Sequence, residues 1–64
     1  MNYSALIKEL RDRRFLSQTD LAKILGVTYV TISRWESGRF KPTFSSKRKL
    51  NHLFIEEKLI QVKQ

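Results

Sequence analysis

Apolar residues near the start of the chain recur every three or four positions, at Tyr3, Leu6, Ile7 and Leu10. The charged residues between them fall on the opposite side of a helical wheel, which is the pattern of an amphipathic helix with one face on a core. This pattern predicts a first helix over residues 3–13 that ends near Arg14.

A second short helix is indicated by a start signal and a stop signal. Ser17 and Asp20 have the spacing of a capping box, in which the hydroxyl accepts a hydrogen bond from a free amide and the carboxylate places negative charge in the first turn. Gly26 stands at the other end, where a residue without a side chain can enter the left-handed region and stop the helix. The helix between them is predicted over residues 18–25, with a buried face made by Leu21, Ala22 and Leu25.

A third helix should follow this glycine almost at once. The hydroxyl of Thr28 can cap it, and it should extend through Glu36. Ile32 and Trp35 are three positions apart and are expected to face the core, with Val27 packing beneath the corner. The opposite face would then point outward, and it carries Tyr29, Val30, Ser33 and Arg34.

Pro42 predicts a loop after the third helix, because proline disfavours helix in the residue before it. Phe40 in this loop is expected to turn inward. A fourth helix should start near Ser45 or Ser46, and its apolar face is predicted at Leu50, Leu53 and Phe54. Two alternatives stay open for the last residues: either this helix continues through Ile55, Leu59 and Val62, or it breaks into an extended segment.

The composition narrows the classes of protein that the chain can belong to. Its 64 residues suffice for one small domain. With no cysteine and one histidine it can form neither a disulfide nor the usual zinc sites, so no metal or other cofactor is expected. His52 stands alone, without a nucleophile, an acid partner or a glycine-rich phosphate loop, so an enzyme is not expected. No apolar run approaches the roughly 20 residues of a membrane span, and no signal-peptide pattern is present, so we expect a cytoplasmic protein without a membrane partner.

Basic residues outnumber acidic ones by 13 to 6, which leaves a net charge of +7. Such a field favours an anionic partner, and nucleic acid is the simplest one because each neutralised phosphate releases counterions. Residues 34–49 contain one acid, Glu36, and the basic residues Arg34, Arg39, Lys41, Lys47, Arg48 and Lys49. The alternative is a solvated surface. RNA stays open on charge alone, although a helical chain lacks the aromatic sheet that stacks RNA bases.

The residues around the corner between the second and third helices also match a known pattern. They are Gln18, the L-A pair at 21–22, the G-V-T corner at 26–28, Ile32, the W-E pair at 35–36, Gly38 and Pro42. In this joint spacing the chain resembles the phage repressor and Cro-like (Xre) helix-turn-helix family, from about residue 3 to residue 54. The resemblance implies a compact all-α, repressor-like DNA-binding domain of four to five helices, whose recognition helix, residues 28–37, lies in the major groove.

The resemblance further implies which side chains would read bases: Thr28, Tyr29, Val30, Ser33 and Arg34. A guanidinium can pair with guanine O6 and N7 at once, which makes Arg34 the best candidate, with a phosphate contact or a solvated arginine as the alternative. Val30 offers only apolar contact, most naturally to a thymine methyl group. Tyr29 can donate a hydrogen bond or pack on the sugar-phosphate wall, or it can pack on its own domain.

The implied phosphate contacts, which would position the protein without reading sequence, are Gln18, Thr28, Ser37, Arg39 and Lys41. Gln18 stands at the start of the second helix, where free amides and the helix dipole favour an anion. For Thr28 the capping role is the simpler one. The basic run 47–49 either extends this footprint or forms a solvated face. Arg11 and Glu36 match the positions of an internal ion pair in the family.

Two features depart from the family pattern. The family often has glycine two positions before the serine of the capping box, whereas this chain has Phe15, which disfavours a positive φ, so the first turn is expected to differ. The family usually has a fifth helix that contributes to its dimer. Here the tail, residues 55–64, leaves only these side chains for a partner-facing surface: Ile55, Leu59, Ile60 and Val62.

The expected function is that of a sequence-specific regulator of transcription that binds double-stranded DNA, and more narrowly a repressor. A homodimer on a pseudo-palindromic operator would place two recognition helices about 34 Å apart. The alternative is an antitoxin-like module that docks a protein partner through its apolar tail.

Overall fold

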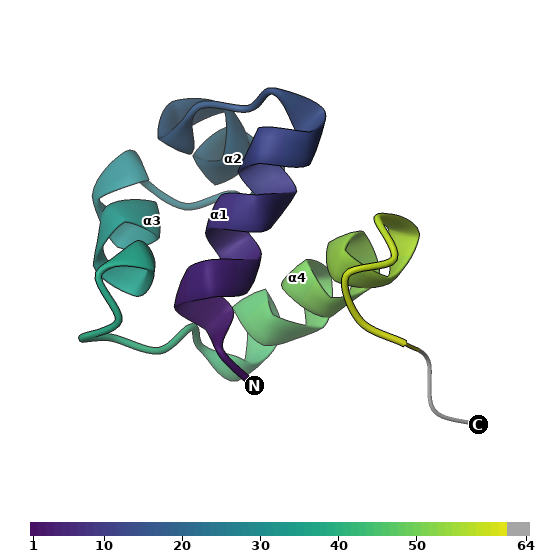
Figure 1. Cartoon of the computed structure of the whole chain (residues 1–64). Helices are drawn as coiled ribbons and strands as arrows, with labels where there is room; N and C mark the ends of the chain where they lie inside the picture. Colours follow the sequence, from purple (N-terminus) through teal and green to yellow (C-terminus); the bar gives the residue numbers. More distant parts are fainter. Residues whose placement is uncertain (62–64) are drawn as a thin grey trace.

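Four helices follow one another in the computed structural model, which describes residues 1–61 (Figure 1). They are α1 (Tyr3–Arg14), α2 (Gln18–Leu25), α3 (Tyr29–Glu36) and α4 (Phe44–Glu56). No strand is present in this described part, so the predicted all-α class is confirmed. None of these helices has the length and the apolar character needed to cross a membrane.

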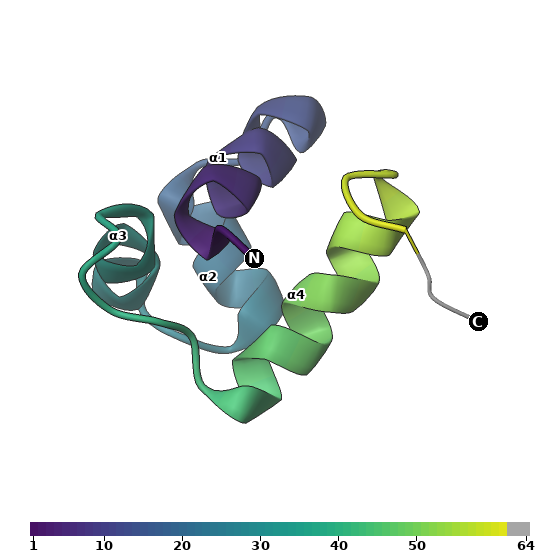
Figure 2. The same ribbon diagram turned by 60° about the horizontal axis from the view of Figure 1, so that its bottom comes forward.

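The core is a single cluster to which every helix contributes. Its members are Ile7, Leu10, Leu21, Ala22, Leu25, Ile32, Trp35, Leu50 and Phe54. These include most of the apolar positions that the helical spacing predicted, and Trp35 lies among them with 5% of its surface exposed. Four other predicted positions are partly buried and pack against the cluster: Tyr3, Leu6, Val27 and Leu53. Figure 2 shows α1 and α2 in the middle of the molecule, with α3 on one side of them and α4 on the other. The outer side of α3 is therefore left for other contacts.

Each helix begins where a polar side chain replaces the missing partner of its first amides. The oxygen of Asn2 accepts from Ala5 N at 3.1 Å before α1, and Ser17 and Asp20 form the predicted reciprocal capping box before α2. Thr28 caps α3, as predicted. Thr43 caps α4 by accepting from Ser46 N at 3.3 Å, and α4 therefore begins at Phe44, just before the predicted start.

The turn between α1 and α2 corrects one expectation. Phe15 adopts the left-handed conformation with φ 55°, although its side chain was expected to avoid it. This conformation lets Phe15 N donate to Asp12 O and Leu16 N donate to Arg11 O, at 3.3 and 2.9 Å, which closes the helix. Leu16 then packs against the core, whereas the ring of Phe15 is 92% exposed. Helix closure and the burial of Leu16 offset the cost of a strained backbone at Phe15.

The tail after α4 follows neither of the two alternatives left open. Lys58 takes a positive φ of 59°, and Leu59 N donates to Phe54 O at 2.8 Å, so the chain turns back at the end of α4. Leu59 and Ile60 pack against the core of their own domain. The left-handed turn after α4 therefore directs these two candidates for a partner-facing surface toward the core, where they are partly buried. Val62 lies outside the described residues, and residues 57–61 form no fifth helix.

Candidate nucleic-acid interface

The corner between α2 and α3 is fixed by backbone geometry and by one lysine. Gly26 has φ 73°, as its position predicted, and Val27 N donates to Ala22 O at 2.9 Å. From α4, the ammonium group of Lys49 donates to Leu25 O at 3.3 Å, where the carbonyl end of α2 carries partial negative charge. The corner is thus held by contacts from both sides, and the direction of α3 follows from it.

The two faces of α3 differ sharply in exposure. Ile32, Trp35 and Glu36 are buried. On the other side Tyr29 and Val30 are 58% and 40% exposed, and Ser33 and Arg34 are exposed as well. Tyr29 therefore does not pack into its own domain. The structure brings the predicted base-reading side chains together on one outward face.

Thr28, at the beginning of that face, is occupied by its own helix. Its hydroxyl accepts from Thr31 N at 3.3 Å and lies 3.1 Å from the hydroxyl of Thr31. The capping role inferred from the sequence is therefore present.

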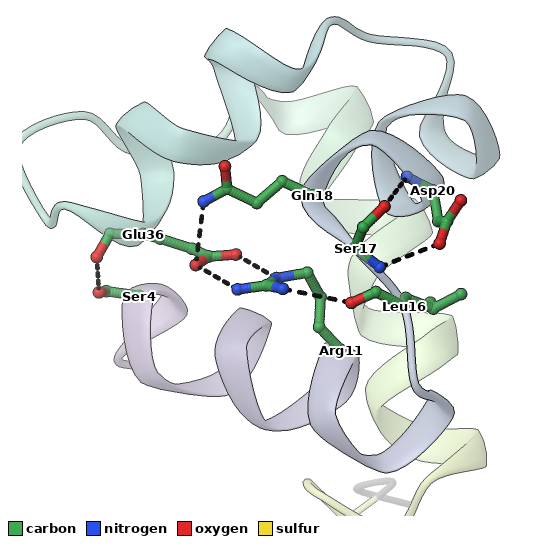
Figure 3. Close-up of polar contacts among 7 residues, drawn as sticks. All are labelled: Ser4, Arg11, Leu16, Ser17, Gln18, Asp20 and Glu36. Carbon is green, nitrogen blue, oxygen red and sulfur yellow. Dashed lines mark hydrogen bonds and ion pairs between the residues drawn. The ribbon is translucent and has the colours of Figure 1, made fainter.

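Three polar side chains, Arg11, Gln18 and Glu36, form a hydrogen-bonded cluster that we call the polar lock (Figure 3). It joins α1 and α2 to the C-terminal end of α3. Arg11 Nε lies 2.6 Å from Glu36 Oε2, and a second guanidinium nitrogen lies 2.9 Å from Oε1, which gives the predicted ion pair a bidentate geometry. This hydrogen bond raises the pKa of Arg11 above its ordinary value. Gln18 donates to Glu36 Oε1 at 3.4 Å, and Ser4 donates its hydroxyl to the backbone oxygen of Glu36. The lock fixes the end of α3 against α1 and α2.

Gln18 therefore has an internal partner that its predicted phosphate role did not include. Its side chain is half-buried and directed at Glu36, as Figure 3 shows. Nearby, the carboxylate of Asp20 accepts from Ser17 N at 3.0 Å, and this bond together with one to the Ser17 hydroxyl lowers the pKa of Asp20. The first turn of α2 thus carries a negative charge of its own.

The loop after α3 corrects the expectation for Phe40. Its ring is 54% exposed instead of turned inward, and Pro42 is the buried residue of this segment. The guanidinium carbon of Arg34 lies 5.5 Å from the centre of the Phe40 ring. Ser37 donates its hydroxyl to Arg34 O at 2.6 Å, so this predicted phosphate residue also has an internal partner. Both other predicted phosphate contacts of the loop, Arg39 and Lys41, are exposed.

Charge is segregated between the two sides of the molecule. Every ion pair of the described residues involves an arginine of α1: Arg11 with Glu36, Arg13 with Glu9, and Arg14 with Glu56 and Glu57. The basic residues between 34 and 49 therefore have no carboxylate partner within the part of the chain that is described. Acidic side chains neutralise α1 and leave the side of α3 positive.

The three basic residues of the run 47–49 have different surroundings. The ammonium group of Lys47 lies 5.5 Å from the centre of the Tyr3 ring, and Lys49 is bonded to the corner. Two of the three residues thus contact their own domain, a role that the charge run did not reveal. Sequence reasoning also missed the contact of Phe40 with Arg34, because a contact between a helix and the following loop has no periodic signal.

Comparison with known proteins agrees with this geometry. A model of the helix-turn-helix family matches residues 7–54, which is most of the chain, and the protein belongs to this family. The predicted resemblance is thereby confirmed, and the protein is a DNA-binding helix-turn-helix regulator of transcription. No curated protein and no solved structure shows significant similarity to the chain.

Proposed function

We propose that this protein is a sequence-specific repressor that reads the major groove of double-stranded DNA with α3. The observation that carries the proposal is the outward face of α3, where Tyr29, Val30 and Arg34 are exposed on a helix whose other face is locked into the core. A helix of this kind is about 10–12 Å wide with its side chains, and the major groove is about 12 Å wide.

Each exposed side chain of this face has a chemically distinct role in the proposal. Arg34 pairs with O6 and N7 of guanine, a contact worth about 1–3 kcal/mol of discrimination. Val30 contacts a thymine methyl group, and Tyr29 donates to a base or packs on the sugar-phosphate wall. Ser33 accepts or donates one hydrogen bond. The absence of any exposed carboxylate on α3 supports this assignment, because an acid there would repel phosphates.

The residues beside this face would hold the phosphate backbone. Arg39 and Lys41 are exposed and positively charged, and they follow α3 directly, where the wall of the groove would lie. The internal hydrogen bonds already use part of the side chains of Gln18, Thr28 and Ser37. These residues can contact phosphate only through donors that those bonds do not use. Arg39 and Lys41 therefore carry most of the proposed electrostatic contact.

A homodimer on a pseudo-palindromic operator is part of the proposal, with two copies of α3 about 34 Å apart. Such a dimer would occupy an operator and block polymerase in the cytoplasm. The antitoxin-like alternative has less support, because Leu59 and Ile60 are partly buried against the core of the domain.

Selection of bound sites from a random duplex library tests the proposal. We expect the wild-type protein to enrich one sequence, and Arg34→Ala to relax selection at one base pair by roughly 5- to 150-fold. Arg48→Ala is the matched control, because it removes an exposed arginine from α4 and should leave the selected sequence unchanged. An Arg34→Ala profile identical to the wild-type profile would refute base reading by Arg34. The mass of the complex at micromolar concentration then gives the stoichiometry, and a single chain per site would refute the dimer.

A further inference from the structure

Arg34 differs from the arginines of α1 in the partner that holds its guanidinium. Arg11, Arg13 and Arg14 are each paired with carboxylates. Arg34 has no side-chain hydrogen bond or ion pair within the described residues, and its guanidinium instead lies over the ring of Phe40, 5.5 Å from the ring centre. Its hydrogen-bond donors are therefore not consumed by the protein.

The loop after α3 is folded so that Phe40 returns to this side of the helix. Gly38 has φ 82°, and its N–H donates to Trp35 O at 3.2 Å, which turns the chain back at the helix end. Ser37 donates its hydroxyl to Arg34 O at 2.6 Å and accepts from Arg39 N at 3.3 Å. These bonds tie the start of the loop to the last turn of α3 and hold the ring of Phe40 against Arg34.

The ring of Phe40 reduces the conformational entropy that the Arg34 side chain loses when it binds a base. A free arginine side chain loses much rotamer freedom when it is fixed on a base. A guanidinium that is attracted to the face of an aromatic ring is already restricted, while its N–H groups, which lie in its own plane, still point past the ring. The contact gives a role to an aromatic residue that is 54% exposed, in a loop whose buried residue is Pro42.

We propose that Phe40 is a positioning residue for base reading: it holds the guanidinium of Arg34 ready for a guanine and thereby sets the specificity of that contact without touching the base. This inference rests on the proposed function, because it assumes that Arg34 reads a base. It adds a residue of the loop to the determinants of specificity on α3.

The test compares Phe40→Leu with Phe40→Tyr on the duplex selected by the wild-type protein and on its variants at the base pair that Arg34→Ala relaxes. Phe40→Leu keeps an apolar side chain and removes the ring, so the ratio of dissociation constants between the variant and selected duplexes should fall about two- to fivefold. Phe40→Tyr keeps a ring and should retain the wild-type ratio. Phe40 lies outside the core cluster, so both variants should fold, which a thermal melt checks.

Two further measurements separate positioning from other roles. In the Arg34→Ala background, Phe40→Leu should leave the affinity for both duplexes unchanged, because there is no guanidinium to position. In the free protein, ring-current shifts of the Arg34 side-chain protons should be present in the wild type and lost in Phe40→Leu. An equal loss of affinity with and without Arg34, or the absence of these shifts in the wild type, overturns the inference.

The outcomes also distinguish this inference from the proposed function. If the wild-type protein selects no duplex sequence, both fail together. If Arg34→Ala relaxes one base pair and Phe40→Leu preserves the wild-type ratio, the inference alone fails.

Discussion

Glu36 is the only charged residue among the described ones that is buried, with 6% of its surface exposed. A buried carboxylate is costly unless hydrogen-bond donors surround it. Here Arg11 supplies two bonds and Gln18 a third, and no buried side-chain nitrogen or oxygen in the described part of the chain lacks a partner. The sequence pattern of the family indicated the pair of Arg11 and Glu36, but not the contribution of Gln18.

Arg11→Ala should lower the free energy of unfolding by about 3 kcal/mol, because it leaves the carboxylate of Glu36 buried with too few donors. This value is at the low end of the range for such losses, since the Arg11 side chain is itself 20% exposed. Arg13→Ala is the control, because its pair with Glu9 is exposed and should contribute at most about 1 kcal/mol. Urea unfolding of both variants measures the difference, and equal losses would contradict the structural role of the lock.

Phe15→Gly should raise the free energy of unfolding by about 1 kcal/mol. Glycine adopts the φ of 55° without steric cost, and the exposed ring of Phe15 contributes little burial to lose. Phe15→Ala separates the two effects, because it removes the ring and keeps the left-handed cost. Urea unfolding should therefore rank Phe15→Gly above both the wild type and Phe15→Ala, and any other order would show that the backbone at this turn is not strained.

The capping box of Ser17 and Asp20 should make the stability of the fold depend on pH in the acidic range. The pKa of Asp20 lies below its ordinary value of 3.8 because the backbone N–H and the hydroxyl of Ser17 bond its carboxylate. A carboxyl group with a lowered pKa stabilises the fold above the pKa of the unfolded chain, and this contribution is lost as the pH falls through the folded pKa. Melting temperatures of the wild type and Asp20→Asn should thus differ at neutral pH and converge only as the pH falls below 3.8 and through the lowered pKa of Asp20. A difference that stays constant across this range would contradict the assignment.

At the scale of helices, the sequence predicted the helix bounds accurately where capping residues close in the sequence determine them. The bounds of α2 and α3 follow from Ser17, Gly26 and Thr28, whose roles depend on neighbours within a few residues. The end of the chain was not predictable in this way, because the turn at Lys58 is stabilised by packing on the core, and the sequence there has no glycine to mark it.

The corner offers a test of the link between helix geometry and binding. Gly26→Ala should cost about 1–2 kcal/mol of stability, because alanine disfavours the left-handed φ of 73°. A Cβ there would meet no atom within 4 Å, so the cost is conformational and not a clash. Gly26→Asn is the control, because asparagine tolerates this region better. The free energy of unfolding and the affinity for duplex DNA should both decrease more in Gly26→Ala than in Gly26→Asn. Equal values for the two variants would refute the role of the corner.

At the scale of the whole molecule, the composition indicated an anionic partner, but it did not indicate which side of the protein would contact that partner. That information comes from ion pairing, since the acidic residues that form ion pairs all pair with arginines of α1: Glu9, Glu36, Glu56 and Glu57. These contacts join residues far apart in sequence, as between Arg14 and Glu57. On and after α3, the basic residues Arg34, Arg39 and Lys41 have no carboxylate partner in the described part of the chain, which no reading of charge along the sequence could establish.

The salt dependence of binding should reflect this segregation. Lys41→Ala should weaken binding to all duplex sequences alike and reduce the slope of log affinity against log salt by about 1. Lys58→Asn is the charge-matched control, because Lys58 lies in the turn that follows α4. Figures 1 and 2 show the end of α4 on the side of the molecule away from α3. Titrations at several salt concentrations measure both slopes, and equal changes would show that Lys41 acts only through net charge.

Methylation interference on the selected duplex tests the central claim most directly, because guanine N7 lies in the major groove and adenine N3 in the minor groove. If α3 enters the major groove, methylation of guanine N7 at the base pair assigned to Arg34 should prevent binding of the wild-type protein. The same modification should matter much less to Arg34→Ala, and methylation of adenine N3 within the α3 contact should be tolerated. Interference at adenine N3 alone, with none at guanine N7, would contradict the account.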